Sequence, residues 1–230
     1  MNLKDLTLLT ATFNNNTLTG IMLKSFSKQM GALPSVVIID NGNKTPIDPR
    51  MKKAFYVVDN YKHKLLTDEN QPSRNHCKAI EYALSNNVHT KWVLLVDNDI
   101  LFKPSVKELL STVDDSIDCI GEIGWDVIQP DRIFPYFCLI NMDRYRQNNI
   151  HYYNPNKCMK LFDENWNELR NVPNGYYGLY DTGCSFLESI RRYNWNIQEI
   201  LLNNYIVHLK NGSFGNKNAY EFLTKYKELH

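Results

Sequence analysis

The sequence has no apolar run that approaches the roughly 20 residues of a membrane-spanning helix. Its first residues, MNLKDLTLLTATF, place an acidic residue inside a short apolar stretch and lack the architecture of a signal peptide. It also has no long block of like charge, because 26 basic residues are interspersed with 25 acidic ones, for a formal net charge of +1. These absences argue against a membrane or secreted protein, and nothing indicates a nucleic-acid partner. We therefore expect a soluble, cytoplasmic protein.

Cysteine is scarce and is not arranged in pairs. The chain has five cysteines, an odd number, and no CxxC motif; they are Cys77, Cys119, Cys138, Cys158 and Cys184. This spacing excludes the common zinc frameworks and suits a reducing compartment. We expect each cysteine to be a small buried apolar side chain.

Internal repeats, low-complexity tracts and linkers are also absent. The chain has 230 residues, of which 43% are hydrophobic and 12% aromatic. This is enough to bury one good core. We therefore expect a single domain over residues 1–230.

Apolar strands alternate with amphipathic helices in the first half. The expected strands are 6–12, 35–40, 55–59 and 92–97. The spacing of apolar residues predicts a helix from Thr17 to Met30, capped by Thr17, and another that begins at Ser73. Continuously apolar strands that alternate with helices indicate a parallel sheet covered on both faces. The predicted fold class is α/β, with a doubly wound, mostly parallel sheet.

The second half is less regular. GEIGW, PYFCLINM and NYIVHL predict strands at 121–125, 135–142 and 204–209. A helix is expected from Thr182 to Tyr193, with Asp181 as its cap.

The stretch LLVDNDILF ends a predicted buried strand on two carboxylates, Asp97 and Asp99. A plain turn would use the same residue types. An EF-hand loop is excluded, because Leu101 and Phe102 stand where it needs another oxygen ligand and a glycine. Leu101 and the central position of the motif also argue against an aspartyl-nucleophile phosphatase. Two carboxylates at this spacing can instead hold one hard cation at the mouth of the strand.

Three predicted strands end in polar side chains. These are Thr10 and Thr12, then Asp40, then Asp97 with Asp99. The carboxyl ends of parallel strands share one edge of a sheet, where ligands collect. A divalent ion held there with open positions can bind a diphosphate and neutralise its charge as it departs. The sequence therefore predicts a site from which a phosphorylated group leaves.

The order of these features resembles that of a known enzyme family. Threonines at the end of the first strand are followed by IIDNGN, a helix opening SRN and a strand ending VDND. This order resembles the nucleotide-sugar half of the GT-A glycosyltransferases, especially the large family 2 type, over residues 5 to 110. The resemblance implies a single GT-A-like domain with a nucleotide-sugar half (1–110) and an irregular acceptor half (111–230).

The resemblance implies roles for the nucleotide-binding residues. Thr10 and Thr12 would lie against the nucleobase, and Asp40 would accept a hydrogen bond from a uracil-like ring N–H. Arg74 would lie beside the base or the phosphates. These roles suit the chemistry, since a carboxylate can recognise an imide N–H and a guanidinium suits phosphate. Taken singly, Asp40 can also be a turn cap and Arg74 a solvated residue at a helix start.

The resemblance also implies a metal site. Asp97 would face the ribose or a metal-bound water, and Asp99 the metal itself. NYIVHLKNGSFG resembles the family's late strand, so His208 would be a further metal ligand, and Gly212 and Ser213 would approach the diphosphate. Imidazole beside carboxylates favours Mn²⁺ as the cofactor, with Mg²⁺ as the alternative. A buried core histidine is the competing interpretation of His208.

The stretch YDTGCSFLESIRRYNW resembles the family's Glu-Asp segment, in which an acid pair opens a helix. Asp181 would be the general base, which takes a proton from the acceptor hydroxyl late in the transition state. Backbone N–H groups at a helix start would stabilise its negative charge. However, Tyr180 stands where Glu is usual and Gly183 where a second acid often follows. A simple capping role for Asp181 therefore competes, and Glu188 is the alternative base.

The implied function is metal-dependent transfer of a sugar from a nucleoside diphosphate, with a UDP-sugar as the expected donor, to a hydroxyl of a glycan or other acceptor. A positioned base favours inversion at the anomeric carbon, although retaining enzymes share the donor half. Aromatic residues of the second half can offer flat faces to a sugar ring, but core packing is the commoner role. These residues are Trp125, Tyr136, Tyr152, Tyr153, Trp166, Tyr176 and Tyr177.

Two alternatives stay open. A sugar-phosphate nucleotidyltransferase uses a similar sheet but needs a glycine-rich loop after the first strand, where ATFNNNTLTG has Gly20 alone, too late in the stretch. A non-catalytic nucleotide-sugar binding domain would keep the pocket and lose the chemistry, and the departures at Tyr180 and Gly183 keep that interpretation open.

Overall fold

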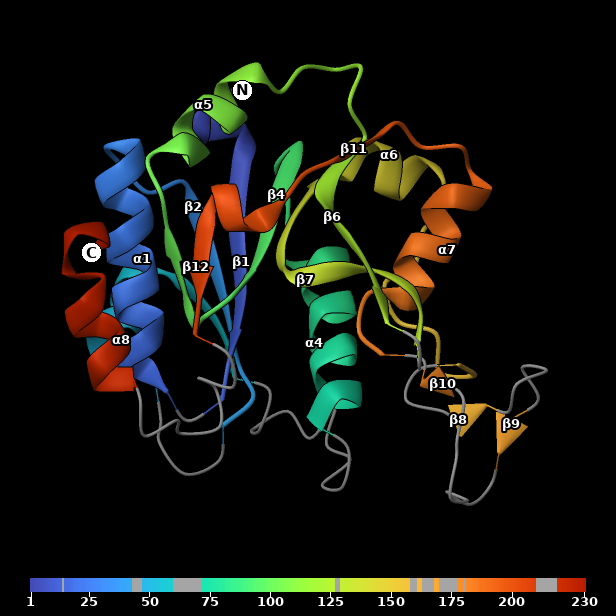
Figure 1. Ribbon diagram of the computed structural model, residues 1–230, viewed down its shortest axis with the longest axis horizontal. Helices are drawn as coiled ribbons and strands as arrows, with labels where there is room; N and C mark the ends of the chain where they lie inside the picture. The colour runs from blue at the N-terminus through green and yellow to red at the C-terminus, as the bar shows by residue number, and fades with distance from the viewer. Residues whose placement is uncertain are drawn as a thin grey trace.

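The computed structural model describes residues 1–13, 15–42, 47–59, 72–126, 129–157, 161–162, 168–169, 178–179, 181–209 and 219–230. Within them, the main sheet has seven strands in the order β11-β6-β7-β4-β1-β2-β3 (Figure 1). Its strands are β1 (Leu6–Thr12), β2 (Ser35–Asp40), β3 (Tyr56–Asp59), β4 (Trp92–Asp97), β6 (Cys119–Asp126), β7 (Gln129–Asn141) and β11 (Ile197–Glu199).

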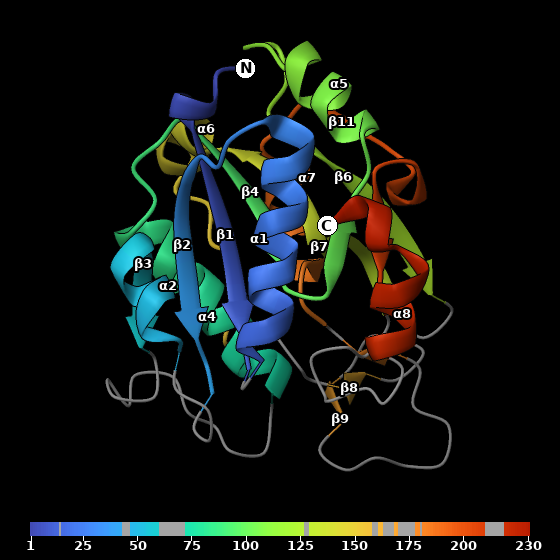
Figure 2. The same cartoon turned by 90° about the vertical axis from the view of Figure 1, so that its left-hand side faces the viewer.

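The sheet is mostly parallel, as the sequence predicts. β1 pairs in parallel with both β2 and β4, β2 with β3, and β11 with β6. The exception is β7, which runs antiparallel to β4 and β6. The parallel strands β1 and β2 end at the lower edge in Figure 2, which places their carboxyl ends together.

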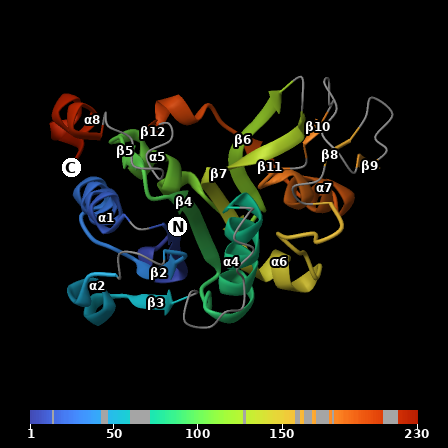
Figure 3. The same ribbon diagram turned by 90° about the horizontal axis from the view of Figure 1, so that it is seen from below.

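Helices cover both faces of the sheet, which confirms the doubly wound arrangement (Figure 3). α1 (Asn16–Met30) and α5 (Ser105–Thr112) cover one face, and α4 (Pro72–Asn86), α6 (Met142–Gln147) and α7 (Cys184–Arg192) cover the other. Successive strand residues point to opposite faces. Accordingly, Leu8 packs in the cluster that contains Phe26 of α1, whereas Leu9 packs with Ile80 of α4.

Three predicted helix starts are wrong by one or two residues, and one of them is the start expected at Ser73, because α4 begins at Pro72. α1 begins at Asn16, and its cap is the side chain of Asn15, which accepts a hydrogen bond from the Leu18 N–H at 3.1 Å. Thr17 is therefore not the cap. The helix expected at Thr182 begins at Cys184.

The second half contains the predicted strands and several short additional elements. β12 (Ile206–His208) lies within the predicted NYIVHL strand and pairs antiparallel with β5 (Ile100–Phe102). The remaining short elements are the small sheet β8 (Leu161–Phe162), β9 (Glu168–Leu169) and β10 (Gly178–Leu179), the helices α2 (Pro49–Ala54) and α8 (Ala219–Lys225), and the 3-10 turns Leu3–Asp5, Leu202–Asn204 and Lys227–Leu229.

The expectation for the cysteines is confirmed where the structure describes them. Cys77, Cys119, Cys138 and Cys184 are buried, and Cys158 lies outside the described residues. In the described part of the chain, no helix combines the length and apolar character that crossing a membrane requires.

Candidate functional site

The end of β4 holds the two aspartates of the LLVDNDILF stretch. Val93 and Leu95 point toward the α4 face of the sheet, so the alternation of the strand places Asp97 on that face as well. Asp97 is the last residue of β4, and its side chain is 23% exposed. Asp99 follows in the turn before β5 and is only 4% exposed.

Pairing between β5 and β12 brings His208 to the aspartates. His208 lies opposite Ile100, directly after Asp99 in the chain. The backbone N–H of Leu209 donates to the Asp99 carbonyl at 2.9 Å, which fixes the end of β12. As a result, His208 Nε2 lies 3.2 Å from Asp99 Oδ1.

Asp97, Asp99 and His208 form a group that can hold one metal ion. Each offers one ligand atom, and these atoms lie within 4.8 Å of one another. Two carboxylates and an imidazole are a suitable donor set for a divalent transition metal. The structure therefore brings together the three residues that the sequence singled out as metal ligands.

His76 is a neighbour of this group that the sequence analysis passed over. It lies in the first turns of α4, and its Nε2 is 3.8 Å from Asp97 Oδ1. Burial raises the pKa of Asp97, while the nearby His76 lowers it and the Asp99 carboxylate raises it further. A bound divalent cation would favour the ionised form. No local pattern marks His76, because its proximity depends on how α4 packs across β4.

Asn98, between the two aspartates, ties this turn to the first strand and helix. Its Nδ2 donates to the hydroxyl oxygens of Thr12 at 3.1 Å and of Thr19 at 3.2 Å. Asn98 is 1% exposed. The amide therefore fixes the backbone from which Asp97 and Asp99 project, a role that the sequence analysis missed.

The residues that are predicted to contact the nucleobase lie together at the ends of β1 and β2. Thr12 and Asp40 are register partners, and the N–H of Asn41 donates to the Thr12 carbonyl at 2.9 Å. Asp40 Oδ1 accepts the N–H of Gly42 at 3.0 Å. Thr12 and Asp40 are buried. Thr10, two residues before Thr12 in β1, is fully buried. Within the described residues, the Thr10 hydroxyl has no hydrogen-bond partner.

The structure describes Arg74, whereas several other predicted site residues lie outside the described part of the chain. Arg74 lies in the first turn of α4, two residues before His76. Gly212, Ser213, Trp166, Tyr176, Tyr177 and Tyr180 lie outside the described residues, as does the side chain of Trp125.

Asp181 does not cap α7, which corrects that part of the sequence interpretation. α7 begins at Cys184, and the residue at its N-cap is Gly183, which makes no side-chain capping bond. The Asp181 carboxylate instead accepts hydrogen bonds from its neighbour Thr182 N–H at 2.7 Å and from Arg132 Nη1 at 2.5 Å. An ion pair with a β7 residue therefore holds Asp181.

Steric crowding explains why position 183 is a glycine. Gly183 has a φ of +93°, and a Cβ there would lie 2.1 Å from the carbonyl oxygen of Ile133. No other residue fits this close approach to β7 without strain. The second acid that the family pattern often has here could not be accommodated.

Glu188, the alternative base, lies further along α7. Lys157 Nζ donates to both carboxylate oxygens of Glu188, at 2.7 and 2.8 Å. Both side chains are partly exposed.

A stack of side chains along β7 connects Asp181 and the metal-ligand group. Arg132, Phe134 and Tyr136 alternate along the strand. The Arg132 guanidinium lies 5.1 Å from the Phe134 ring centroid, and Phe134 stacks on Tyr136 with centroids 5.0 Å apart. Tyr136 in turn stacks on His208 at 4.5 Å with an interplanar angle of 17°. The Tyr136 ring therefore packs against the rings of Phe134 and His208.

Two other aromatic residues suggested for sugar stacking are placed by the structure. Tyr152 is 1% exposed and stacks on Phe186 at 5.3 Å, so it belongs to the core. Tyr153 is partly buried, with Lys78 Nζ 5.9 Å from its ring centroid.

No protein-family model and no curated protein matches this chain. Among solved structures, it is similar to the galactosyltransferase LgtC in complex with donor and acceptor sugar analogues, with 15% identity and a TM-score of 0.45 over 61% of this chain and 59% of that one. It is also similar to TarS from S. aureus in complex with UDP, with 15% identity and a TM-score of 0.44 over 64% and 50% of the two chains.

A third similar structure is the mannosyltransferase PcManGT from Pyrobaculum calidifontis in complex with GDP-Man and Mn²⁺. Its identity is 11%, and its TM-score is 0.48 over 85% of this chain and 54% of that one. In all three cases the match spans less than two thirds of the solved chain. With TM-scores below 0.5, these likenesses decide nothing about the activity of the chain.

Proposed function

We propose that this protein is a metal-dependent glycosyltransferase that moves a sugar from a nucleoside diphosphate sugar, a UDP-sugar, to an acceptor hydroxyl with inversion. The observation that carries this proposal is the group formed by Asp97, Asp99 and His208 at the carboxyl edge of the sheet. The predicted nucleobase residues Thr12 and Asp40 lie at the ends of neighbouring strands on the same edge.

Asp99 and His208 would hold the metal, with Asp97 as the third ligand or as the partner of a ribose hydroxyl. Their donor atoms suit Mn²⁺ better than Mg²⁺, because an imidazole is a natural ligand of the former. When bound, the metal would neutralise the charge that develops on the departing diphosphate. Asn98 would hold the two aspartates in place through its bonds to Thr12 and Thr19.

The nucleotide would lie over the ends of β1 and β2. Asp40 would accept the ring N–H of uracil, with Thr10 and Thr12 beneath the base. Arg74 would contact the base or the phosphates from the start of α4, and Ser213 would approach the diphosphate. In this arrangement residues 1–110 form the nucleotide-sugar half and residues 111–230 the acceptor half.

Asp181 would act as the general base toward the acceptor hydroxyl of a glycan or another molecule. The ion pair with Arg132 orients this carboxylate. The carboxylate would exchange part of this ion pair for the acceptor hydroxyl and take its proton as the new glycosidic bond forms. Glu188 is the alternative base, although Lys157 engages both of its oxygens.

The Arg132–Asp181 ion pair also favours a second candidate function. If this pair stays closed when the donor is bound and keeps the acceptor hydroxyl away from Asp181, the protein would be a nucleotide-sugar binding domain without transfer activity. Donor hydrolysis in the presence of Mn²⁺ separates the two, because an enzyme consumes the donor and a binding domain leaves it intact.

Thermal unfolding with nucleotide and metal tests the donor site. A ligand that binds the native state alone raises the melting temperature by mass action. We expect UDP with Mn²⁺ to raise it and EDTA to remove the shift. A panel with UDP, GDP and other nucleoside diphosphates that gives no shift would contradict the proposal, and a shift with GDP alone would revise the donor.

A further inference from the structure

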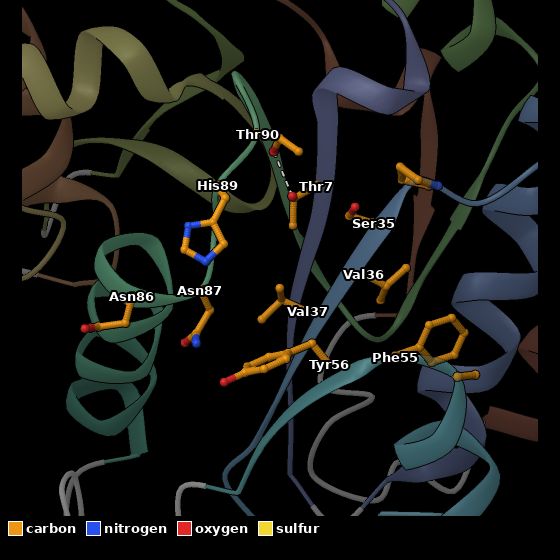
Figure 4. Close-up of a pocket in the computed structure, with 12 residues that line it drawn as sticks. Thr7, Ser35, Val36, Val37, Phe55, Tyr56, Asn86, Asn87, His89 and Thr90 are labelled. Carbon is orange, nitrogen blue, oxygen red and sulfur yellow. Dashed lines mark hydrogen bonds between the residues drawn. The ribbon is translucent and has the colours of Figure 1, made fainter.

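A cavity lies at the amino ends of the strands, at the opposite end of the sheet from the metal-ligand group. It has a volume of about 530 Å³ and is formed by the first residues of β1, β2 and β3 together with the end of α4 (Figure 4). Sites for small ligands usually have volumes of about 300 to 1,000 Å³. The cavity is therefore large enough for one or two sugar rings.

Its position separates this cavity from the proposed transfer site. Thr7 and Thr90 line it at the amino ends of β1 and β4, whereas Asp97 is the last residue at the carboxyl end of β4. A six-residue strand spans roughly 15 to 20 Å at about 3.3 Å per residue. A sugar ring bound in the cavity is therefore too far from the metal ligands to contact them.

The lining favours an uncharged, hydroxyl-rich ligand. Among the described residues that line the cavity there is no Lys, Arg, Asp or Glu, so nothing in that set would balance a phosphate or carboxylate. The polar groups are instead amides and hydroxyls, joined by the imidazole of His89. Tyr56 lies among them with 59% of its surface exposed. An exposed ring beside neutral hydrogen-bonding groups is suited to the apolar face of a pyranose.

One buried acceptor in the lining requires a donor. The Oδ1 atom of Asn87 is buried, and among the described residues it has no hydrogen-bond partner. By contrast, Thr7 and Thr90 bond to each other at 2.7 Å, and Thr90 also donates to the Trp92 carbonyl at 2.8 Å. A buried acceptor without a partner destabilises the folded state. Rotation of the Asn87 amide would turn this oxygen toward the cavity, where a sugar hydroxyl could supply the missing donor.

The geometry of Tyr56 and Asn87 allows both contacts in one ligand. In Figure 4 the Tyr56 ring extends from β3 toward Asn86, the last residue of α4, and Asn87, which follows it. We propose that this cavity binds a neutral carbohydrate, with a pyranose ring against Tyr56 and a hydroxyl donating to Asn87 Oδ1. This site does not depend on the proposed transfer activity, and it would hold a glycan at a distance from the reacting centre.

Calorimetric titration with neutral hexasaccharides tests the site. Maltohexaose, cellohexaose and chitohexaose are titrated into the full chain in the presence of EDTA. At least one is expected to bind, and Tyr56→Ala is expected to weaken its binding at least about tenfold. Tyr56→Phe should bind like the wild type, because it keeps the ring. Asn87→Leu should weaken binding, because it removes the acceptor.

Matched controls make the outcome specific. Tyr193→Ala removes an exposed tyrosine of comparable exposure, 45%, outside this cavity, and should leave binding unchanged. The proposal is overturned if no hexasaccharide binds, if Tyr56→Ala binds as well as wild type, or if Asp99→Asn abolishes binding. Binding of adenosine or uridine that Tyr56→Ala abolishes, without any hexasaccharide binding, would also overturn it and assign the cavity to an aromatic ligand.

Discussion

Asp97 and Asp99 are two positions apart yet have different surroundings. Asp99 is almost fully buried and faces His208 at 3.2 Å, whereas Asp97 is partly exposed and faces His76 at 3.8 Å. As proposed metal ligands, the two carboxylates are therefore not equivalent. The buried one would be a permanent ligand, and the exposed one would be shared with a ribose or a water.

Replacing Asp99 should remove metal-dependent nucleotide binding. Asp99→Asn keeps the size of the side chain and loses its charge, so Mn²⁺ affinity should fall at least about 10- to 100-fold, the usual effect of losing even an outer-shell partner. The measurement is the melting-temperature shift with UDP and Mn²⁺. Asp115→Asn, an exposed carboxylate paired with Lys91, is the control and should keep the shift. A normal shift in Asp99→Asn would show that the metal binds elsewhere.

Replacing Asp181 should separate binding from transfer. Asp181→Asn should keep the UDP and Mn²⁺ shift and lower the transfer rate by about 10² to 10⁴, the usual contribution of a general base. Transfer is measured as sugar incorporation into an acceptor panel. Glu188→Gln should transfer at the wild-type rate. The opposite pattern, with Glu188→Gln inactive and Asp181→Asn active, would assign the base to Glu188.

Gly183 and Gly31 allow a matched test of backbone strain. Both have positive φ angles, but a Cβ at Gly183 meets the Ile133 carbonyl at 2.1 Å, whereas a Cβ at Gly31 has nothing within 4 Å. Gly31→Ala should cost about 1 to 2 kcal/mol of unfolding free energy, and Gly183→Ala about 3 kcal/mol or more. Urea unfolding measures both. Equal costs would mean that β7 yields to the added methyl group.

At the scale of elements, the β5–β12 pair and the side-chain stack on β7 hold His208 from two sides. Tyr136 stacks on the imidazole, and burial raises the pKa of Tyr136 to about 12, so its hydroxyl stays neutral near pH 7. We infer that the ring, rather than the hydroxyl, positions His208.

This inference predicts different effects for two Tyr136 variants. Tyr136→Phe should keep Mn²⁺ affinity within about twofold, whereas Tyr136→Ala should lower it about 10-fold or more, as expected for a group that orients a metal ligand. Metal titration followed by the melting temperature measures both. If Tyr136→Ala bound Mn²⁺ like the wild type, the β5–β12 pairing alone would suffice to orient the imidazole.

Elements with a strong local pattern were predictable, and contacts between distant elements were not. β1, β2 and β4 match their predicted bounds, because each is almost continuously apolar and ends on a polar residue. The grouping of Asp97, Asp99 and His208 followed from the family resemblance. The neighbours His76 and Arg132 left no sequence signal, because helix packing and strand pairing bring them to the site. The start of α7 was misplaced because Asp181 is a typical capping residue whose side chain is instead bound to Arg132.

At the scale of the whole molecule, hydrogen bonding joins the two proposed halves. β4, the last strand of residues 1–110 in the main sheet, pairs with β7 from Trp92 to Val96. Both apolar clusters contain residues from each half, for example Leu94 with Leu139 and Leu95 with Cys138. Neither half can complete its core alone.

A fragment of residues 1–110 should therefore fail to fold cooperatively. It would expose the apolar edge of β4, which is also a template for aggregation. Urea unfolding followed by circular dichroism should give no sigmoidal transition for the fragment and one for the full chain. A cooperative transition in the fragment would instead show that the nucleotide-sugar half is an independent domain.

The distance along the chain between Asp99 and His208 bears on when a metal can be captured during synthesis. A ribosome-bound chain that has emerged only as far as β7 presents the two aspartates without the imidazole, so it would hold Mn²⁺ weakly. If Mn²⁺ binds as proposed, tight capture would await the emergence of β12 and its pairing with β5, and metal loading would be one of the last steps in the maturation of this protein.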